Sequence, residues 1–575
     1  MAGVIIEDER FVVLANADPP APLAEPTYAL KDAELFAARP DPDAGLFVAT
    51  CGDFATGSDA PSERFMGATI AGRSLRAALV RSGMLRRWYV ACPNDDLVEL
   101  DRRPDDIARE HAVAMPMYWR IAADEAVALA HKGLIHALVS TAFDNPQNLL
   151  FRATTRLAVP AIAYVHSIPD LSAELLHLLA GQTFAFDALI APSQAGKRAL
   201  EAHFGRIEAS LAVKPYAGEI LVIPHGVEAR PLPDRPAARG DLGWADDQEV
   251  LLALGRFERD YKADLAPLLS VFARVARQRP HARLVLAGAD DGVYALQLDA
   301  LAAELGIGER VELRPNVSDE TKGRLLAAAD ALVAIADNVQ ETHGLSVIEA
   351  MFAGLPVVAA AWDGYNETVV HDQTGWLIDS AWHPPSADTL ATASLWLGPG
   401  RPLPLQAQHV GLDNGRLEHA LGQILGDRAL ARRFGDAGRA HAEASFDATK
   451  NGRRAAAAIS ERSRAARASE LTWRPHLGAD WLAVYGHYAS AAPAPALTAA
   501  PAVGEALGER RFGQVDRASR KRVAKMLARL VEIADGRSRE AIAAQLEADF
   551  PMVRREAIER WIARALKHDL LRRVP

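Results

Sequence analysis

Short apolar segments alternate with longer amphipathic segments along most of the chain. Alternation of this kind indicates βαβ units and a parallel sheet, because a strand buried on both faces is apolar throughout and its crossover helix is apolar on one side only. The first such series predicts strands at 45–51, 88–92, 135–140 and 161–166, with an amphipathic helix at 70–81.

A second series begins near Glu249. It predicts strands at 250–254, 282–287, 310–313, 331–335 and 356–360, and helices at 265–278, 294–305 and 318–329. A segment rich in proline and glycine, 224–240, separates the two series and is typical of an interdomain linker. The chain is therefore predicted to form two doubly wound, Rossmann-like α/β domains that face a cleft, with ligands bound beyond the carboxyl ends of the strands.

The pattern becomes helical beyond Leu425, with helices expected at 429–444 and 448–468. An aromatic-rich segment follows and is expected to pack back onto the body, and three amphipathic helices are expected at 514–533, 537–548 and 553–568. The predicted domains are an N-terminal Rossmann-like domain at 1–235, a second one at 236–445, helices and the aromatic segment at 446–488, an Ala/Pro-rich linker at 489–508, and a basic helical domain at 509–575.

The bulk composition is that of a soluble globular protein, with 50% hydrophobic and 24% charged residues in 575. The net charge of −10 argues against a chain built mainly to bind nucleic acid. Residues 509–575 nevertheless hold 17 Lys and Arg against 10 Asp and Glu, so the preceding residues carry a net charge of −17. No signal peptide is predicted, and no apolar stretch approaches the roughly 20 residues of a membrane span, which favours a cytoplasmic location.

Several kinds of site are disfavoured. Two cysteines, Cys51 and Cys92, provide neither a disulfide framework nor a cysteine zinc site, and the histidines lack zinc-ligand spacing. The chain contains no GxxxxGK[ST] phosphate loop, which disfavours an NTPase. Asp41-Pro-Asp43 matches a D-x-D metal motif, but it precedes the first predicted strand and is set aside.

The stretch ETHGLSVIEAMFAGLPVV, residues 341–358, has two interpretations. In the structural one, Ser346 and Glu349 form a capping box, Gly354 ends the helix and Glu341 is an ordinary loop acid. In the chemical one, the helix start follows a strand and a glycine loop and so presents free amides to an anion at the ligand edge of the sheet. The two interpretations are compatible.

The neighbouring segments favour the chemical interpretation. Strand 250–254 delivers Arg256 and then Lys262 to the same edge of the same predicted domain. Two cations and a helix N-terminus suit a diphosphate, whereas the carboxylates of Glu341 and Glu349 suit two sets of hydroxyl groups. Together these groups predict a nucleotide-sugar site.

The stretch resembles the E-x7-E signature of the family 4 retaining glycosyltransferases, which adopt the GT-B fold. Four further segments resemble that family in order and at suitable separations: VIPHGVE (222–228), LALGRF (252–257), RLVLAGAD (283–290) and GYNETVVHDQTGWLI (364–378). The resemblance spans about residues 160–445. It implies a hexosyltransferase that uses a UDP- or GDP-linked sugar as donor, needs no metal or other cofactor, and acts on an unidentified acceptor such as a glycan or lipid.

The resemblance also implies roles for individual residues. Glu341 would contact hydroxyl groups of the donor sugar and Glu349 those of the ribose, while Arg256 and Lys262 would hold the diphosphate. The amides of Gly344, Leu345 and Ser346 would assist, His166 in AYVHSIPD would lie beside the donor sugar, and Gly67 would form the glycine turn near the phosphates, with Gly52 as a competitor.

Two positions depart from the family pattern. The spacing from Arg256 to Lys262 is one residue longer than usual, and His343 replaces an aromatic residue, which bears on donor preference. The implied mechanism is a front-face transfer with retention, in which the enzyme stabilises an oxocarbenium-like transition state by holding the negative charge of the leaving diphosphate.

Other classes of function remain open. The body could be a non-catalytic nucleotide-sugar sensor or adaptor that acts through the C-terminal helices, in which residues 539–571 could form a helix-turn-helix. The favoured interpretation of 509–575 is a bundle for oligomerisation or for docking to an acidic protein. Residues 510–525 could instead contact anionic lipid at the membrane surface.

Overall fold

In the computed structural model, the described residues are mainly 179–259, 262–290, 293–339, 341–383, 406–471 and 528–550, with shorter segments elsewhere. The shorter segments include 157–166 and the strands of the N-terminal sheet. Gly67, Gly52 and the helix predicted at 70–81 lie outside the described residues, as does most of the aromatic segment 471–488.

The N-terminal domain is built on a seven-stranded parallel sheet with the order β3-β2-β1-β4-β5-β6-β7. Its strands are β1 (Leu46–Cys51), β2 (Leu85–Cys92), β3 (Ala112–Pro116), β4 (Ala137–Ser140), β5 (Ala161–Tyr164), β6 (Ala188–Ala191) and β7 (Glu219–Val222). Helix α10 (Gln194–Leu211) connects β6 to β7. Four of these strands were predicted from the sequence, and β3, β6 and β7 were not.

The second domain repeats this topology in a six-stranded parallel sheet, with the order β10-β9-β8-β11-β12-β13. The strands are β8 (Glu249–Leu254), β9 (Ala282–Gly288), β10 (Val311–Pro315), β11 (Ala331–Ala334), β12 (Val357–Ala360) and β13 (Gly375–Ile378). The helices are α11 (Arg235–Leu242), α12 (Ala266–Gln278), α13 (Tyr294–Glu304), α14 (Asp319–Ala328), α15 (Leu345–Phe352), α16 (Tyr365–Thr368), α19 (Asn414–Gly426) and α20 (Arg428–Ser445). A short antiparallel pair, β14 (Ser380–Trp382) and β15 (Val410–Leu412), follows β13.

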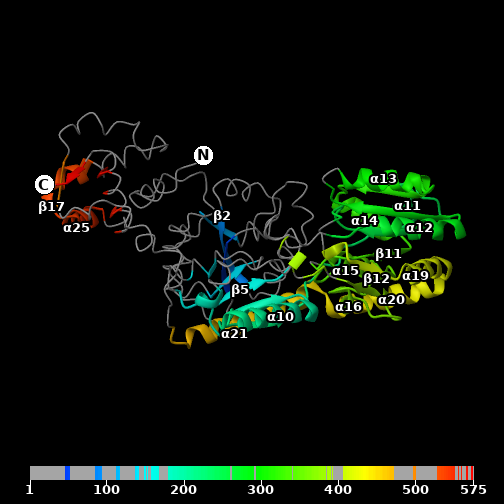
Figure 1. The fold of residues 1–575 in the computed structure, drawn as a ribbon, viewed down its shortest axis with the longest axis horizontal. Coiled ribbons are helices and arrows are strands. Elements are labelled where there is room, and N and C mark those ends of the chain that lie inside the picture. Colours follow the sequence, from blue (N-terminus) through cyan, green and yellow to red (C-terminus); the bar gives the residue numbers. More distant parts are fainter. Residues whose placement is uncertain are drawn as a thin grey trace.

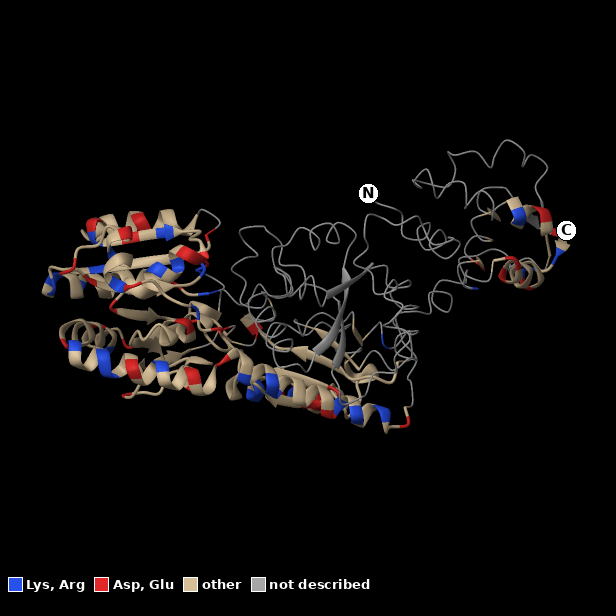
Figure 2. Ribbon diagram, turned by 180° about the vertical axis from the view of Figure 1, so that it is seen from behind, with Lys and Arg blue, Asp and Glu red and all other residues tan. Residues whose placement is uncertain are grey.

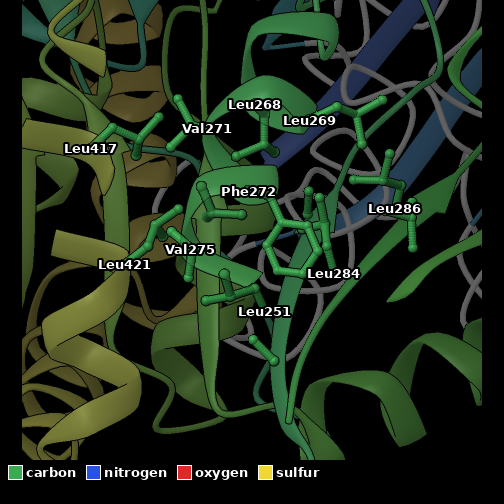
Figure 3. Packing of buried hydrophobic residues seen from close by; sticks show 14 of the residues in the cluster. Leu251, Leu268, Leu269, Val271, Phe272, Val275, Leu284, Leu286, Leu417 and Leu421 are labelled. Atoms are coloured by element: carbon green, nitrogen blue, oxygen red, sulfur yellow. The ribbon is translucent and has the colours of Figure 1, made fainter. Parts of the chain in front are cut away.

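Apolar helix faces hold these layers together. Helix α12 buries one face between strands β8 and β9 and helix α19, as Figure 3 shows for Phe272, Leu251, Leu284 and Leu421. Lys, Arg, Asp and Glu lie mostly on the helices that cover the sheets, whereas the central strands are nearly free of them (Figure 2). This distribution is the physical basis of the alternating pattern in the sequence.

The predicted linker 224–240 is wrong in its second half, because α11 begins at Arg235. This helix packs against α14, and the guanidinium of Arg239 lies 2.8 Å from the Asp330 carboxylate. The second domain therefore starts within the proline-rich segment.

The chain crosses between the domains at two adjacent points. The amide of Val227 donates to the carbonyl of Phe446 at 2.8 Å, and the amide of Ala448 donates back to Val227 at 3.2 Å. A Cβ atom on Gly226 would lie 2.4 Å from Cα of Ala448, so only glycine allows this close crossing. Helix α21 (Ala448–Arg467) then returns to the N-terminal domain, where Ser463 donates to the carbonyl of His136.

The C-terminal part differs from a purely helical domain. The described strands β16 (Leu497–Ala499), β17 (Asp535–Arg537) and β18 (Leu571–Arg573) form an antiparallel sheet in the order β17-β16-β18. Strand β16 falls within the predicted linker, which therefore contributes to this unit. Helix α25 (Arg539–Asp549) buries its own apolar face, and Figure 1 shows α25 and β17 far from α13 and α14. Among the described residues, no helix is long and apolar enough to cross a membrane.

Candidate functional site

Two neighbouring strands of the second domain end at the candidate site. Strand β8 ends at Leu254 and leads to Arg256, while the adjacent strand β11 ends at Ala334 and leads to the loop that contains Glu341. The strand order reverses between β8 and β11, because β9 lies on the far side of β8 and β12 on the far side of β11. Reversal of this kind opens a crevice at the carboxyl edge of a doubly wound sheet, where ligands bind.

A cavity of about 350 Å³ lies at this edge. Of the residues predicted from the sequence, it is lined by His166, Arg256, Lys262, Glu341, Gly344, Leu345, Ser346 and Glu349. The fold thus brings together every predicted site residue except Gly67, on which the structure gives no information. Residues that the sequence analysis did not assign to the site also line it, including His225, Thr342, Lys322 and Tyr365.

The helix at the site starts differently from the predicted capping box. Helix α15 begins at Leu345 with Gly344 as its N-cap, and no side chain caps it. Ser346 therefore lies inside the first turn, and Glu349 makes no capping bond. Gly344 has φ +81°, and a Cβ atom there would lie 2.3 Å from a ring carbon of Tyr365, so this turn requires glycine.

The start of α15 remains suited to an anion. The first amides of a helix have no intrahelical acceptor, and the helix dipole adds partial positive charge at the same end. Because Gly344, Leu345 and Ser346 line the cavity, these amides lie at its wall. A helix of eight residues is short, so the cations beside it carry much of the positive charge.

Lys262 and Glu341 form an ion pair inside the cavity. The ammonium of Lys262 lies 3.2 Å from Oε2 of Glu341, with the two side chains 29% and 15% exposed. The longer spacing between Arg256 and Lys262 therefore does not prevent Lys262 from reaching the predicted sugar-binding acid.

Arg256 has a donor without an acceptor. Its Nη1 atom lies 2.8 Å from Oε2 of Glu258, which partly neutralises the guanidinium. Its Nε atom is buried and has no hydrogen-bond partner. A buried unpaired donor is energetically costly.

A third ion pair lines the same cavity. The ammonium of Lys322, in the first half of α14, lies 2.8 Å from Oε1 of Glu349. The side chains are 14% and 18% exposed. This pairing was not predictable from the sequence, because it depends on how α14 and α15 pack against each other.

Three histidines line the cavity where the domains meet. Nδ1 of His166 lies 3.0 Å from Nε2 of His225, and the rings stack with centroids 4.6 Å apart. His343 contacts the edge of His225, and neither of its ring nitrogens has a hydrogen-bond partner. Burial, assisted by His166, lowers the pKa of His343 to about 3. Burial, His166 and His343 also lower the pKa of His225 well below 6.5, so both imidazoles are neutral at physiological pH.

Two further contacts join the domains beside the site. The hydroxyl of Thr342 donates to the carbonyl of His166 at 2.6 Å. The carboxylate of Glu367, in α16, accepts hydrogen bonds from the amides of Gln194 and Ala195 at the start of α10, both at 2.7 Å. Through these contacts the loop that contains Glu341 and the segment that contains His166 are held in one arrangement.

Asp363 lies close to the same loop. Burial, followed by the charges of Glu341 and Glu367, raises the pKa of its carboxyl group from 3.8 to about 7. Among the described residues, no group of three or more His, Cys, Asp or Glu side chains is arranged to hold a metal ion.

Comparison with known proteins agrees with this geometry. Residues 234–397 match the family model described as "Glycosyl transferases group 1". Two curated relatives are D-inositol 3-phosphate glycosyltransferases. The protein from Segniliparus rotundus is 29% identical over 270 residues, and the one from Geodermatophilus obscurus is 39% identical over 168 residues. These matches cover 44% and 28% of this chain, but only 58% and 36% of the relatives' own lengths.

Two solved structures share the overall fold. Sucrose-phosphate synthase from Thermosynechococcus elongatus aligns with a TM-score of 0.50 at 19% identity, over 73% of this chain and all of the other. A glycosyltransferase from Rickettsia africae aligns with a TM-score of 0.52 at 15% identity, over 73% of this chain and 98% of the other. The two Rossmann-like domains therefore form the GT-B fold, as the sequence predicted.

Proposed function

We propose that this protein is a retaining glycosyltransferase that moves a sugar from a nucleoside-diphosphate sugar to an acceptor. The observation that carries the proposal is one cavity at the crevice of the second sheet, lined by three cations, a helix N-terminus and two carboxylates on different elements. The match of residues 234–397 to the group 1 glycosyltransferase family supports it.

The diphosphate would lie between Arg256, Lys262 and the first amides of α15. A diphosphate oxygen would compete with Glu258 for the guanidinium of Arg256 and with Glu341 for the ammonium of Lys262. Charged donors fixed in advance stabilise the negative charge that develops on a leaving group, and they act strongly where water is excluded. This set supplies the required positive charge without a divalent metal.

The carboxylates would bind hydroxyl groups. Glu341, released from Lys262 when the diphosphate binds, would accept hydrogen bonds from the donor sugar, and Glu349 would accept them from the ribose. Glu341 is not assigned as a nucleophile. In a front-face transfer the departing phosphate takes the proton of the attacking acceptor hydroxyl, so the acceptor attacks from the side that the leaving group vacates and the configuration is retained.

His166 would lie beside the sugar on the N-terminal wall. Its neutral partner His225 and the hydroxyl of Thr342 fix its ring and its backbone carbonyl. Because Nδ1 of His166 already bonds His225, a sugar hydroxyl group would meet the ring at Nε2.

Turnover of a panel of donors tests the proposal. Purified protein is incubated with UDP-, GDP- and ADP-linked hexoses, with and without candidate acceptors and chelator, and release of the nucleoside diphosphate is followed. D-inositol 3-phosphate is one acceptor to include, because the relatives' names specify it. We expect release from one donor class, a product with the donor's anomeric configuration by NMR, and no loss with chelator.

Two variants locate the activity. Glu341→Ala should reduce release by at least about 100-fold, since it removes a charged hydrogen-bond acceptor from the reacting sugar. Glu304→Ala, on the exposed face of α13, is the matched control and should keep wild-type activity. Full activity in Glu341→Ala would refute the assigned site, and donor binding without turnover for every acceptor would favour a sensor.

A further inference from the structure

Lys322 and Glu349 form a wall between two cavities. Both line the donor cavity, and both also line a second cavity of about 590 Å³ on the far side. Lys322 lies on α14 and Glu349 in the second turn of α15, so their ion pair joins two helices at the donor cavity.

The ion pair leaves half of the carboxylate available. Oε1 of Glu349 accepts from Lys322 at 2.8 Å, and among the described residues this is the only hydrogen bond that the Glu349 side chain makes. Asp319 is the other acid beside the ammonium, at 3.9 Å, which is beyond hydrogen-bond distance. Lys322 is therefore committed mainly to one oxygen of Glu349, and Oε2 can accept from a ligand.

We propose that Lys322 is a positioning residue for the nucleoside part of the donor, acting through Glu349. It holds the glutamate side chain in one orientation, so that Oε2 accepts a hydrogen bond from the 2′-hydroxyl of the ribose. This inference rests on the proposed function, which assigns Glu349 to the ribose.

Two physical effects give Lys322 this role. A glutamate side chain loses rotamer entropy when it binds a ligand, and an existing ion pair has already restricted it, so less affinity is lost on binding. The ammonium also offsets the negative charge of Glu349, which would otherwise repel the diphosphate through a poorly screened interior. Loss of the first effect weakens only ligands that carry the ribose hydroxyl, whereas loss of the second weakens the binding of every nucleoside diphosphate equally.

A purely structural ion pair is the competing explanation. A pair that only ties α14 to α15 would change stability when broken, and would not change the preference for ribose over deoxyribose. The ratio of the affinities for the ribonucleotide and the deoxyribonucleotide therefore distinguishes a positioning role of Lys322 from a purely structural one.

Calorimetric titration of the full chain measures that ratio. The probes are UDP and 2′-deoxy-UDP, with GDP and 2′-deoxy-GDP as the second pair. We expect the wild type to prefer the ribonucleotide by roughly 10-fold, the size of one hydrogen bond to a charged group. Lys322→Met, which keeps the aliphatic stem, should reduce the preference to about twofold or less, and Lys322→Arg should restore most of it.

Further variants complete the test. Glu349→Gln should lower the preference for the ribonucleotide over the deoxyribonucleotide. The double variant Glu349→Gln/Lys322→Met should show the same preference as Glu349→Gln alone, because both residues act on one contact. Lys197→Met removes a comparable ammonium, near Glu201 on α10, and should leave the preference unchanged. Circular dichroism confirms that each variant is folded.

Each outcome has a definite meaning. A wild-type ratio in Lys322→Met overturns the role of Lys322 and leaves the proposed function intact. Equal affinity of the wild type for both sugars overturns the ribose contact of Glu349 and the inference with it. Failure of the wild type to bind any of the four nucleotides overturns the proposed function itself.

Discussion

The ammonium of Lys262 lies 3.2 Å from the carboxylate of Glu341, although 79 residues separate them in the chain. The loop after β8 and the loop after β11 meet here, at the point where the strand order reverses. Under the proposed function, this pair would place the cation that binds the diphosphate beside the acid that binds the sugar.

Lys262→Met should reduce kcat/KM for the donor by about 100-fold, because it removes one cation from the leaving diphosphate. The melting temperature should change little, since partly exposed ion pairs contribute only about 0–1 kcal/mol to folding. Lys214→Met, an exposed lysine beyond α10, is the control for loss of charge. A large fall in stability with unchanged kcat/KM would assign Lys262 to the fold rather than the site.

His225 is expected to orient His166. His225→Phe keeps a stacking ring but removes the bond between Nε2 and Nδ1 of His166, so kcat should fall by about 10-fold, the upper end of what one neutral hydrogen bond contributes. His225→Gln restores a polar atom and should recover part of the loss. Affinity for the nucleoside diphosphate, measured by calorimetry, should not change in either variant. A kcat within twofold of wild type for His225→Phe would show that the bond is incidental.

Asp363 should make the protein less stable as the pH rises. Its pKa is about 7 in the folded protein and 3.8 for an ordinary exposed aspartate, so between these values the folded state binds more protons than the unfolded state. Stability is therefore present at low pH and is lost as the pH rises from about 4 to about 7. Asp363→Asn removes the ionisable group and with it this loss of stability. Asparagine also tolerates the left-handed backbone at this position, where φ is 43°.

The Asn variant should be more stable than the wild type by about 1–2 kcal/mol at pH 8, with a smaller difference at pH 5. Urea unfolding at both pH values measures this. A difference that is the same at pH 5 and pH 8 would contradict a raised pKa for Asp363.

Glu367 is expected to hold α10 of the N-terminal domain against the second domain. Glu367→Ala removes two charge-assisted bonds to the amides of Gln194 and Ala195 and leaves the positive end of α10 uncompensated. We expect a loss of about 1–2 kcal/mol in the free energy of unfolding. Glu208→Ala, exposed on α10 itself, should lie within about 0.5 kcal/mol of wild type. Equal effects of the two substitutions would argue against the contact between domains.

The sequence predicted the parts of the site that follow directly from chain order. Arg256 and Glu341 were predicted because each follows a buried strand, and the carboxyl ends of neighbouring parallel strands meet at one edge. The partner of Glu349 was not predictable, since Lys322 reaches it only through the crossing of α14 and α15. The capping box failed for a local reason, because Gly344 in a left-handed conformation starts α15 two residues ahead of Ser346.

Strand β16 and the contact between His166 and His225 were also missed, because both depend on residues far apart in the chain. Strand β16 consists of three residues in an Ala/Pro-rich segment, and only its pairing with β17 and β18 defines it. The contact between His166 and His225 depends on the crossing at Gly226 and Ala448, which local sequence does not reveal.

Calorimetric titration with nucleoside diphosphates tests the central claim most directly. We predict that the wild type binds UDP or GDP with micromolar affinity and the matching monophosphate far more weakly. Arg256→Met should lower the affinity for the nucleoside diphosphate by about 10–100-fold, the value of a charged hydrogen bond at a buried site. The affinity for the monophosphate should fall by less than about threefold. Absence of diphosphate binding in the wild type, or equal affinity in wild type and Arg256→Met, would contradict the proposal that this cavity holds a nucleoside-diphosphate sugar.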